Sequence, residues 1–148
     1  MHPPEPECPM NIELLIGGQP RPAHESATFE RANPLSGETV TQAAAASVED
    51  AQAAADAAAC AFPAWSKTGP GERRMALLRA AERMEARQAE FIERMVDETG
   101  ATPGWAGFNV MVAAGMLREA AALTTQINGD IIPSNVPDNL AMGVRVPC

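Results

Sequence analysis

The chain has 148 residues, a formal net charge of −8 and a pI near 4.7. Its 11 basic residues are interleaved with 19 acidic ones, which argues against a nucleic-acid surface, because such a surface needs clustered lysine and arginine. No window approaches the ~20 apolar residues of a membrane span. The N-terminal sequence MHPPEPECPMNIE lacks the basic and apolar regions of a signal peptide. A cytoplasmic protein with one hydrophobic core is expected.

Cysteine and histidine are too few and too widely spaced to indicate a disulfide framework or a metal site. Cys8, Cys60 and Cys148 form no Cys-x-x-Cys pair, and His2 and His24 have no ligand partner at metal spacing. Cys60 lies in an alanine-rich stretch without a candidate base beside it. A small buried side chain is therefore favoured there over a nucleophile.

The N-terminal part of the chain predicts a disordered tail followed by short strands. Residues 1–10 contain four prolines and no periodic apolar pattern, and Met10 is an alternative first residue. The pair Gly17-Gly18 is typical of a two-residue hairpin turn, and NPLSGE at 33–38 is rich in turn residues. A small antiparallel meander is therefore expected, with strands at 14–16, 29–32 and 39–43.

The first helix is expected at 47–61. Ser47 to Asp50 resembles a capping box, with Asp50 in the place of the usual Glu or Gln. The helix should end near Pro63, and Phe62 and Trp65 should fold back onto the helices as core anchors. A smooth face should let another helix approach closely; it consists of Ala51, Ala54, Ala55, Ala58 and Ala59.

The longest helical pattern runs over 70–98. Pro70 fits the first helical turn, and Gly100 suits a left-handed C-cap. The apolar stripe is weak at Gln88, which leaves a kink or a break near Arg87 open. The stripe itself recurs at helical spacing; it consists of Leu77, Ala81, Met84, Phe91 and Met95.

A third helix is expected at 103–127, begun by Thr102 as N-cap and Pro103 at the first helical position. Residues 129–139 are expected to be a loop, and 140–146 alternate as a strand does. Such a strand needs a sheet to join, and we expect this chain not to supply one unless the N-terminal meander serves. One face of the helix carries larger apolar residues, namely Trp105, Phe108, Val112, Met116, Ala120 and Leu123.

These elements together predict a helix-rich α+β fold with three main helix regions, a short β meander and one C-terminal strand.

Five stretches, read in order, carry a family resemblance: NPLSGETV, AAADAAACAFPAWSKTGPGERRMALLRAAERM, VDETGATP, NGDIIP and GVRVP. They resemble the N-terminal portion of the aldehyde dehydrogenase superfamily, of the salicylaldehyde- and vanillin-dehydrogenase-like type. The resemblance covers about residues 12–148. It implies that residues 11–148 are a partial N-terminal region, concerned with cofactor binding and oligomerisation, of the aldehyde dehydrogenase fold.

The resemblance also implies a parent oxidoreductase that converts an aldehyde to a carboxylate with NAD or NADP. In that family a cysteine thiolate attacks the aldehyde carbon, and a glutamate activates the water that hydrolyses the thioester. None of the three cysteines falls on the nucleophile's motif, and no general base or nucleotide-phosphate loop is matched. The chain alone is therefore expected to be a catalytically inactive fragment that binds no cofactor.

Two sets of residues can be carried over from the resemblance. The helix after ETGATP lines the substrate entrance in relatives, which makes pocket-wall candidates of Trp105, Phe108, Asn109 and Val112. The alternative is that this face packs on neighbouring helices.

The terminal strand resembles an arm of the family's oligomerisation sheet, with Leu140, Met142 and Val144 on one side. It can also be an ordinary edge strand of the monomer. A stand-alone helical oligomerisation or interaction module without catalysis remains the second functional hypothesis. An independent small enzyme is disfavoured, because no nucleophile–base pair can be assembled.

Overall fold

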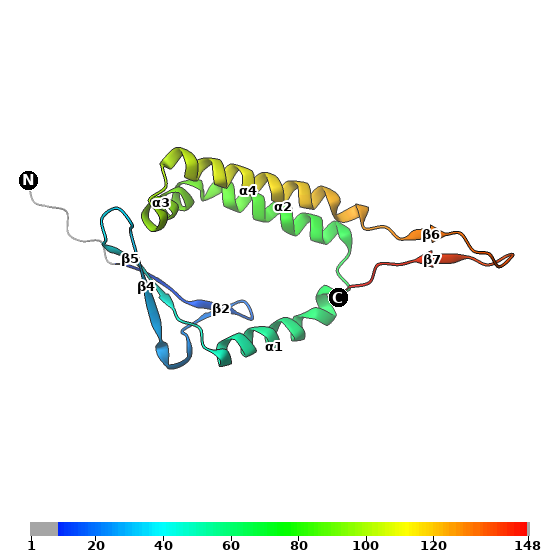
Figure 1. The fold of residues 1–148 in the computed structure, drawn as a ribbon, viewed down its shortest axis with the longest axis horizontal. Helices are drawn as coiled ribbons and strands as arrows, with labels where there is room; N and C mark the ends of the chain where they lie inside the picture. The colour runs from blue at the N-terminus through cyan, green and yellow to red at the C-terminus, as the bar shows by residue number, and fades with distance from the viewer. Residues whose placement is uncertain (1–8, 148) are drawn as a thin grey trace, which may run out of the picture.

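The computed structural model describes residues 9–147, so the expectations for residues 1–8 and for Cys148 lie outside it. Helices α2 and α4 lie side by side, and the hairpin of β6 and β7 projects beyond them as an arm (Figure 1). Two 3-10 turns lie at His24–Ser26 and Thr124–Gln126. The elements in chain order are β1 Met10–Ile12, β2 Leu14–Ile16, β3 Gln19–Arg21, β4 Thr28–Ala32, β5 Thr39–Ala44, α1 Val48–Trp65, α2 Pro70–Ala86, α3 Gln88–Thr99, α4 Pro103–Leu123, β6 Asp130–Ile132 and β7 Ala141–Gly143.

The N-terminal strands form two small sheets, so the expectation of one antiparallel meander was wrong. Strands β2 and β3 form a hairpin around Gly17 and Gly18, whose φ angles of +62° and +78° confirm the turn. The other sheet has the order β1-β5-β4, with β1 parallel and β4 antiparallel to β5. Met10, expected in the disordered tail, begins β1 and pairs with Thr41. The long-range parallel pairing leaves no local turn signal, which is why the sequence did not indicate it.

The central helical stretch is broken where its apolar stripe is weakest. Helix α2 ends at Ala86 and α3 begins at Gln88, with Arg87 between them at φ −106° and ψ 20°. Pro70 occupies the first turn of α2, and Gly100 ends α3 at φ +67°, as the sequence predicts. The break lets α3 turn toward the β4–β5 sheet while α2 stays beside α4.

Helix α1 begins at the expected capping box but ends later than expected. Ser47 and Asp50 exchange both hydrogen bonds of the box. The helix continues through Pro63 to Trp65, although a proline at this position lacks the N–H for one helical hydrogen bond and its ring crowds the carbonyl one turn earlier. The predicted close approach of another helix was wrong, since α1 contacts mainly β2. Ala57 faces the β2–β3 turn near Gly17, while the five alanines of the predicted face are exposed.

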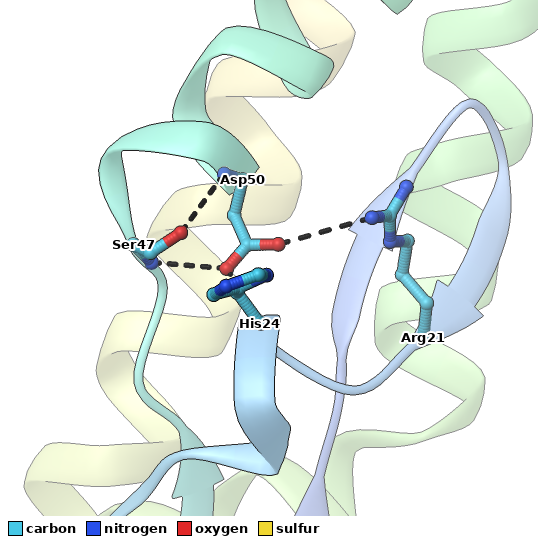
Figure 2. A network of polar contacts seen from close by, with 4 residues as sticks. All are labelled: Arg21, His24, Ser47 and Asp50. Carbon is cyan, nitrogen blue, oxygen red and sulfur yellow. Dashed lines mark hydrogen bonds and ion pairs between the residues drawn. The ribbon is translucent and has the colours of Figure 1, made fainter.

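A buried carboxylate joins the start of α1 to the first hairpin. Asp50 is only 3% exposed, and its Oδ2 accepts hydrogen bonds from the backbone N–H of His24, at 2.9 Å, and of Ser47, at 3.0 Å. The Arg21 guanidinium lies 3.8 Å from Asp50 Oδ1 (Figure 2). The backbone N–H of His24, the backbone N–H of Ser47 and the charge of Arg21 lower the pKa of Asp50 below its ordinary value.

A second polar contact fastens α3 to the larger sheet. Thr41, 2% exposed on β5, donates its hydroxyl to Glu98 Oε1 at 2.7 Å. Arg31 on β4 approaches Glu98 Oε2 at 3.3 Å. Glu98 therefore holds two strands of the sheet against the last turn of α3.

The buried core is small and made mainly of alanine. The accessible surface is 11316 Å² for 15.6 kDa, whereas a compact protein of this mass exposes about 7,200 Å². Much apolar surface therefore faces outward. The buried apolar residues are Ala23, Ala81, Ala106, Val110, Ala114 and Ala121.

Acid should weaken the attachment of α1 through Asp50. The folded-state pKa of Asp50 lies below the ordinary value for an aspartate, so protons bind more tightly to the unfolded chain, and the stabilisation present above the unfolded pKa is lost as pH falls toward and through the folded pKa. Urea unfolding of the wild type, followed from about pH 6 down to about pH 2, should show this loss. Asp50→Asn, which cannot ionise, should remove that part of the acid dependence. An identical pH profile in both chains would contradict the role of Asp50.

Candidate functional site

Helix α4 turns a stripe of small residues inward, and the stripe of larger apolar residues, which the sequence left open between a pocket wall and helix packing, is largely outward. Val110 is 5% exposed, while Trp105 is 59% and Phe108 47% exposed. The inward stripe packs against α2 and α3; a Cβ added at Gly107 would already lie 3.5 Å from Ile92 Cδ1. The inward residues recur at helical spacing; they are Ala106, Val110, Ala114 and Ala121.

The two aromatic residues of α4 are in contact and exposed near its N-terminal end. The Trp105 and Phe108 rings are stacked, with centroids 5.4 Å apart and planes inclined by 26°. The hydroxyl oxygen of Thr102 accepts the Trp105 backbone N–H at 3.3 Å, which confirms the predicted N-cap. The Asn109 amide nitrogen donates to the Trp105 carbonyl at 2.8 Å. The pocket-wall candidates are thus adjacent on one rigid helix, with Val112 half-buried one turn further on.

Two methionines extend the exposed apolar surface of α4 beyond the candidates chosen from the sequence. Met111 is 61% exposed and Met116 67% exposed. Met116 lies in line with Trp105 and Val112, whereas Met111 flanks them on the side of Phe108. Sequence periodicity placed Met116 on the stripe but did not include it among the pocket-wall candidates, and it gave no signal for Met111.

The C-terminal strand joins a partner that the sequence did not indicate. Strand β7 covers only Ala141–Gly143, and it pairs antiparallel with β6 at Asp130–Ile132, inside the segment expected to be a loop. It therefore does not join the N-terminal strands. The two prolines in the segment obscured the short strand. The large apolar side chains of the arm are exposed. Leu140, Met142 and Val144 alternate along the chain and so lie on one side of the strand, as the sequence predicted, and Ile131 lies opposite Met142 on β6.

Two further expectations about α1 were wrong. Phe62 and Trp65 are 41% and 53% exposed instead of core anchors, and with Arg73 and Arg145 they border an open pocket of ≈360 Å³. The Arg73 guanidinium lies 5.3 Å from the Trp65 ring centroid. Cys60, expected to be buried, is exposed, because α1 has no helix packed over that side.

Residues 9–147 contain neither a cluster of possible metal ligands nor a helix that could span a membrane. Within residues 9–147, no three His, Cys, Asp or Glu side chains gather as a possible metal site. Among the same residues no helix is both long enough and apolar enough to pass through a membrane. The strands of residues 9–147 make three small sheets.

Comparison with known proteins gives a consistent result. The family model described as aldehyde dehydrogenase family matches residues 21–148. A vanillin dehydrogenase from Pseudomonas fluorescens is 57% identical over 139 residues, which are 94% of this chain and 29% of that protein. The chain thus spans about 29% of the length of the curated relative.

Two solved structures share the fold. A salicylaldehyde dehydrogenase from Pseudomonas putida G7, complexed with salicylaldehyde, has a TM-score of 0.90 and 45% identity, over 93% of this chain and 28% of that one. An NAD-dependent benzaldehyde dehydrogenase from Corynebacterium glutamicum has a TM-score of 0.78 and 32% identity, over 83% of this chain and 27% of that one. The expected helix-rich mixed fold is confirmed.

Two valines, two residues apart on α4, test which face is the core. Val110→Ala removes two buried methyl groups and should lower the free energy of unfolding by about 2 kcal/mol. Val112→Ala, at a half-buried position, should lower it by less than about 1 kcal/mol. Urea denaturation followed by circular dichroism measures both. A larger loss of unfolding free energy in Val112→Ala than in Val110→Ala would show that the face of Val112, and not that of Val110, packs into the core.

Proposed function

Because this chain belongs to the aldehyde dehydrogenase family, we propose that it is the N-terminal part of an enzyme that oxidises an aromatic aldehyde to the carboxylic acid. The coenzyme of the proposed enzyme is NAD or NADP, which would accept the hydride. The proposal is supported by relatives named for vanillin, salicylaldehyde and benzaldehyde. The observation that carries the aromatic preference is the stacked, exposed pair of Trp105 and Phe108.

In this proposal α4 supplies one wall of the aldehyde site. A flat aromatic substrate can lie against Trp105 and Phe108 and cover apolar surface that would otherwise face water. The helix holds both rings rigidly, because its opposite face is packed on α2 and α3. Asn109 and Val112 complete the wall along the same helix. This chain's own contribution is thus to bind and orient the ring and to exclude water from it.

The catalytic steps belong, in this proposal, to residues other than those described. Cys60 is exposed on α1, and its side chain has no hydrogen bond within residues 9–147, so we do not assign it as the nucleophile. Residues 11–148 would form a partial region that contributes to oligomerisation and to the domain that binds the cofactor. The chain alone would then form no NADH from an aldehyde and bind no dinucleotide.

The proposed parent enzyme is a homo-oligomer, and the β6–β7 arm is the proposed contact. A two-stranded hairpin is at best marginally stable alone in water. Its exposed strand edges and apolar side chains, Leu140, Met142 and Val144 among them, suit pairing with another chain.

The aromatic wall can be tested in the complete enzyme by exchanging tryptophans. Trp105→Ala should lower kcat/KM for an aromatic aldehyde about tenfold relative to an aliphatic aldehyde, because one stacking surface is lost. Trp65→Ala is the matched control, since Trp65 is similarly exposed but lies on α1. Equal losses for both aldehydes in Trp105→Ala would refute the wall.

The genomic context separates this proposal from a stand-alone helical interaction module. The DNA should be read for several hundred bases beyond the codon for Cys148. An open frame, or one restored by a single shift, that encodes a nucleotide-binding strand and later a reactive cysteine supports the enzyme. A stop followed by unrelated sequence would favour the interaction module.

A further inference from the structure

The open pocket of ≈360 Å³ at the end of α1 is built from three parts of the chain. Phe62 and Trp65 come from the last turn of α1, Arg73 from the first turn of α2, and Arg145 from the segment that follows β7. These three parts meet at the base of the arm (Figure 1). The pocket therefore combines two aromatic rings with two guanidinium groups.

The charge around this pocket is opposite to that of the whole chain. The chain has 19 acidic and 11 basic residues, yet among the described residues no aspartate or glutamate lines the pocket. The five ion pairs within residues 9–147 involve other arginines, so neither Arg73 nor Arg145 is paired with a carboxylate there. The pocket is thus a locally positive site that favours an anion.

Both guanidinium groups keep N–H donors to offer. Arg73 Nη2 donates to the Trp65 carbonyl at 3.2 Å, and Arg145 Nε donates to the Asn128 carbonyl at 3.0 Å. Arg73 Nε is shielded from water and has no acceptor within residues 9–147. Because a partly desolvated charge attracts a counter-ion more strongly than a hydrated one, a carboxylate suits this pair of arginines. Its two oxygens match the fork of a guanidinium.

The aromatic rings add a second requirement for the ligand. Phe62 is 41% and Trp65 53% exposed, and the Arg73 guanidinium lies 5.3 Å from the Trp65 ring centroid. A ligand with a flat ring can cover this apolar surface while its charge reaches the arginines. A small inorganic anion would leave the rings facing water, and a neutral aromatic molecule would leave the arginines without a counter-ion.

We propose that this pocket binds a carboxylate carried on an aromatic ring, with Arg73 and Arg145 holding the carboxylate while Phe62 and Trp65 cover the ring. The pocket includes Ile127, beyond the end of α4, whereas Trp105 lies in the first turn of that helix. The proposal therefore goes beyond the aromatic wall. The acid formed in the proposed reaction is one ligand of this class, but the pocket argument does not depend on that reaction.

The test follows the indole N–H signals of Trp65 and Trp105, the two tryptophans of the chain, by NMR while benzoate is added to about 10 mM. Benzoate should shift the Trp65 signal along a saturating curve. Benzamide has the ring without the charge and acetate has the charge without the ring, so each should bind at least about fivefold more weakly. The Trp105 signal reports separately on the α4 wall, so a failure at one surface leaves the other testable.

Three glutamine variants identify the groups that hold the carboxylate. Arg145→Gln and Arg73→Gln should each weaken benzoate binding about fivefold or more, because a charge-assisted hydrogen bond is lost. Arg74→Gln is the matched control, since it removes the same charge from the next position on α2 but does not line the pocket, and it should bind benzoate as the wild type does. Circular dichroism shows whether each variant keeps its helices.

The outcomes are decisive even if one variant fails to fold. Arg145 lies outside the helices, so Arg145→Gln decides the question should Arg73→Gln lose its helical signal. A Trp65 signal that does not move with benzoate would overturn the site. Equal binding of benzoate and benzamide would do the same, because the arginines would then contribute nothing. An equal loss of benzoate affinity in Arg74→Gln and Arg145→Gln would also refute it, since only the overall charge would matter.

Discussion

The close packing of α4 on α2 and α3 through small side chains is the constraint on which the rest of the structure depends. Ala81, Ala106 and Ala114 are fully buried, so the backbones can approach closely, but each buries little apolar area. The Arg118 guanidinium also reaches across to Glu85 on α2, with one bond of 2.6 Å. Because the inward stripe is filled by alanine and valine, the larger apolar side chains of α4 are left on its outer side.

That division of side chains leaves the chain with extended exposed apolar surfaces. A compact chain of ordinary composition would bury Trp105, Phe108 and Met116, whereas here they are exposed on a helix that is rigid. The arm shows the same feature in a strand, with Met142 and Val144 facing outward. Exposed apolar surface of this extent is typical of regions that contact a substrate, another domain or another chain. This exposure is consistent with a chain that spans about 29% of the length of a related aldehyde dehydrogenase.

Local signals in the sequence predicted where α1, α2 and α4 begin and where α3 ends. Ser47 and Asp50 form the capping box, Pro70 and Pro103 begin their helices, and Gly100 adopts the left-handed cap. Each of these features depends on a few neighbouring residues and on hydrogen bonds within one turn. Their chemistry can be read without knowing what the helix packs against.

The burial of α4 could not be predicted in the same way. Its apolar residues surround the helix, so spacing alone does not decide whether the stripe of Trp105 and Phe108 or that of Ala106 and Val110 faces the partner helix. The choice depends on the partner helix, whose own contact residue Ala81 accepts only a close neighbour. Likewise β6 pairs with β7 next to a close backbone approach at Gly129, for which the sequence offers no periodic signal.

Binding of the dye anilinonaphthalene sulfonate to this chain under native conditions tests most directly whether these apolar surfaces are open. The dye should bind while circular dichroism shows the helices intact, and Phe108→Gln and Met142→Gln should each reduce the emission. Val48→Gln is the control, since Val48 is a single exposed residue at the start of α1. A folded monomer that binds no dye would contradict the view that α4 and the arm present surfaces for contact.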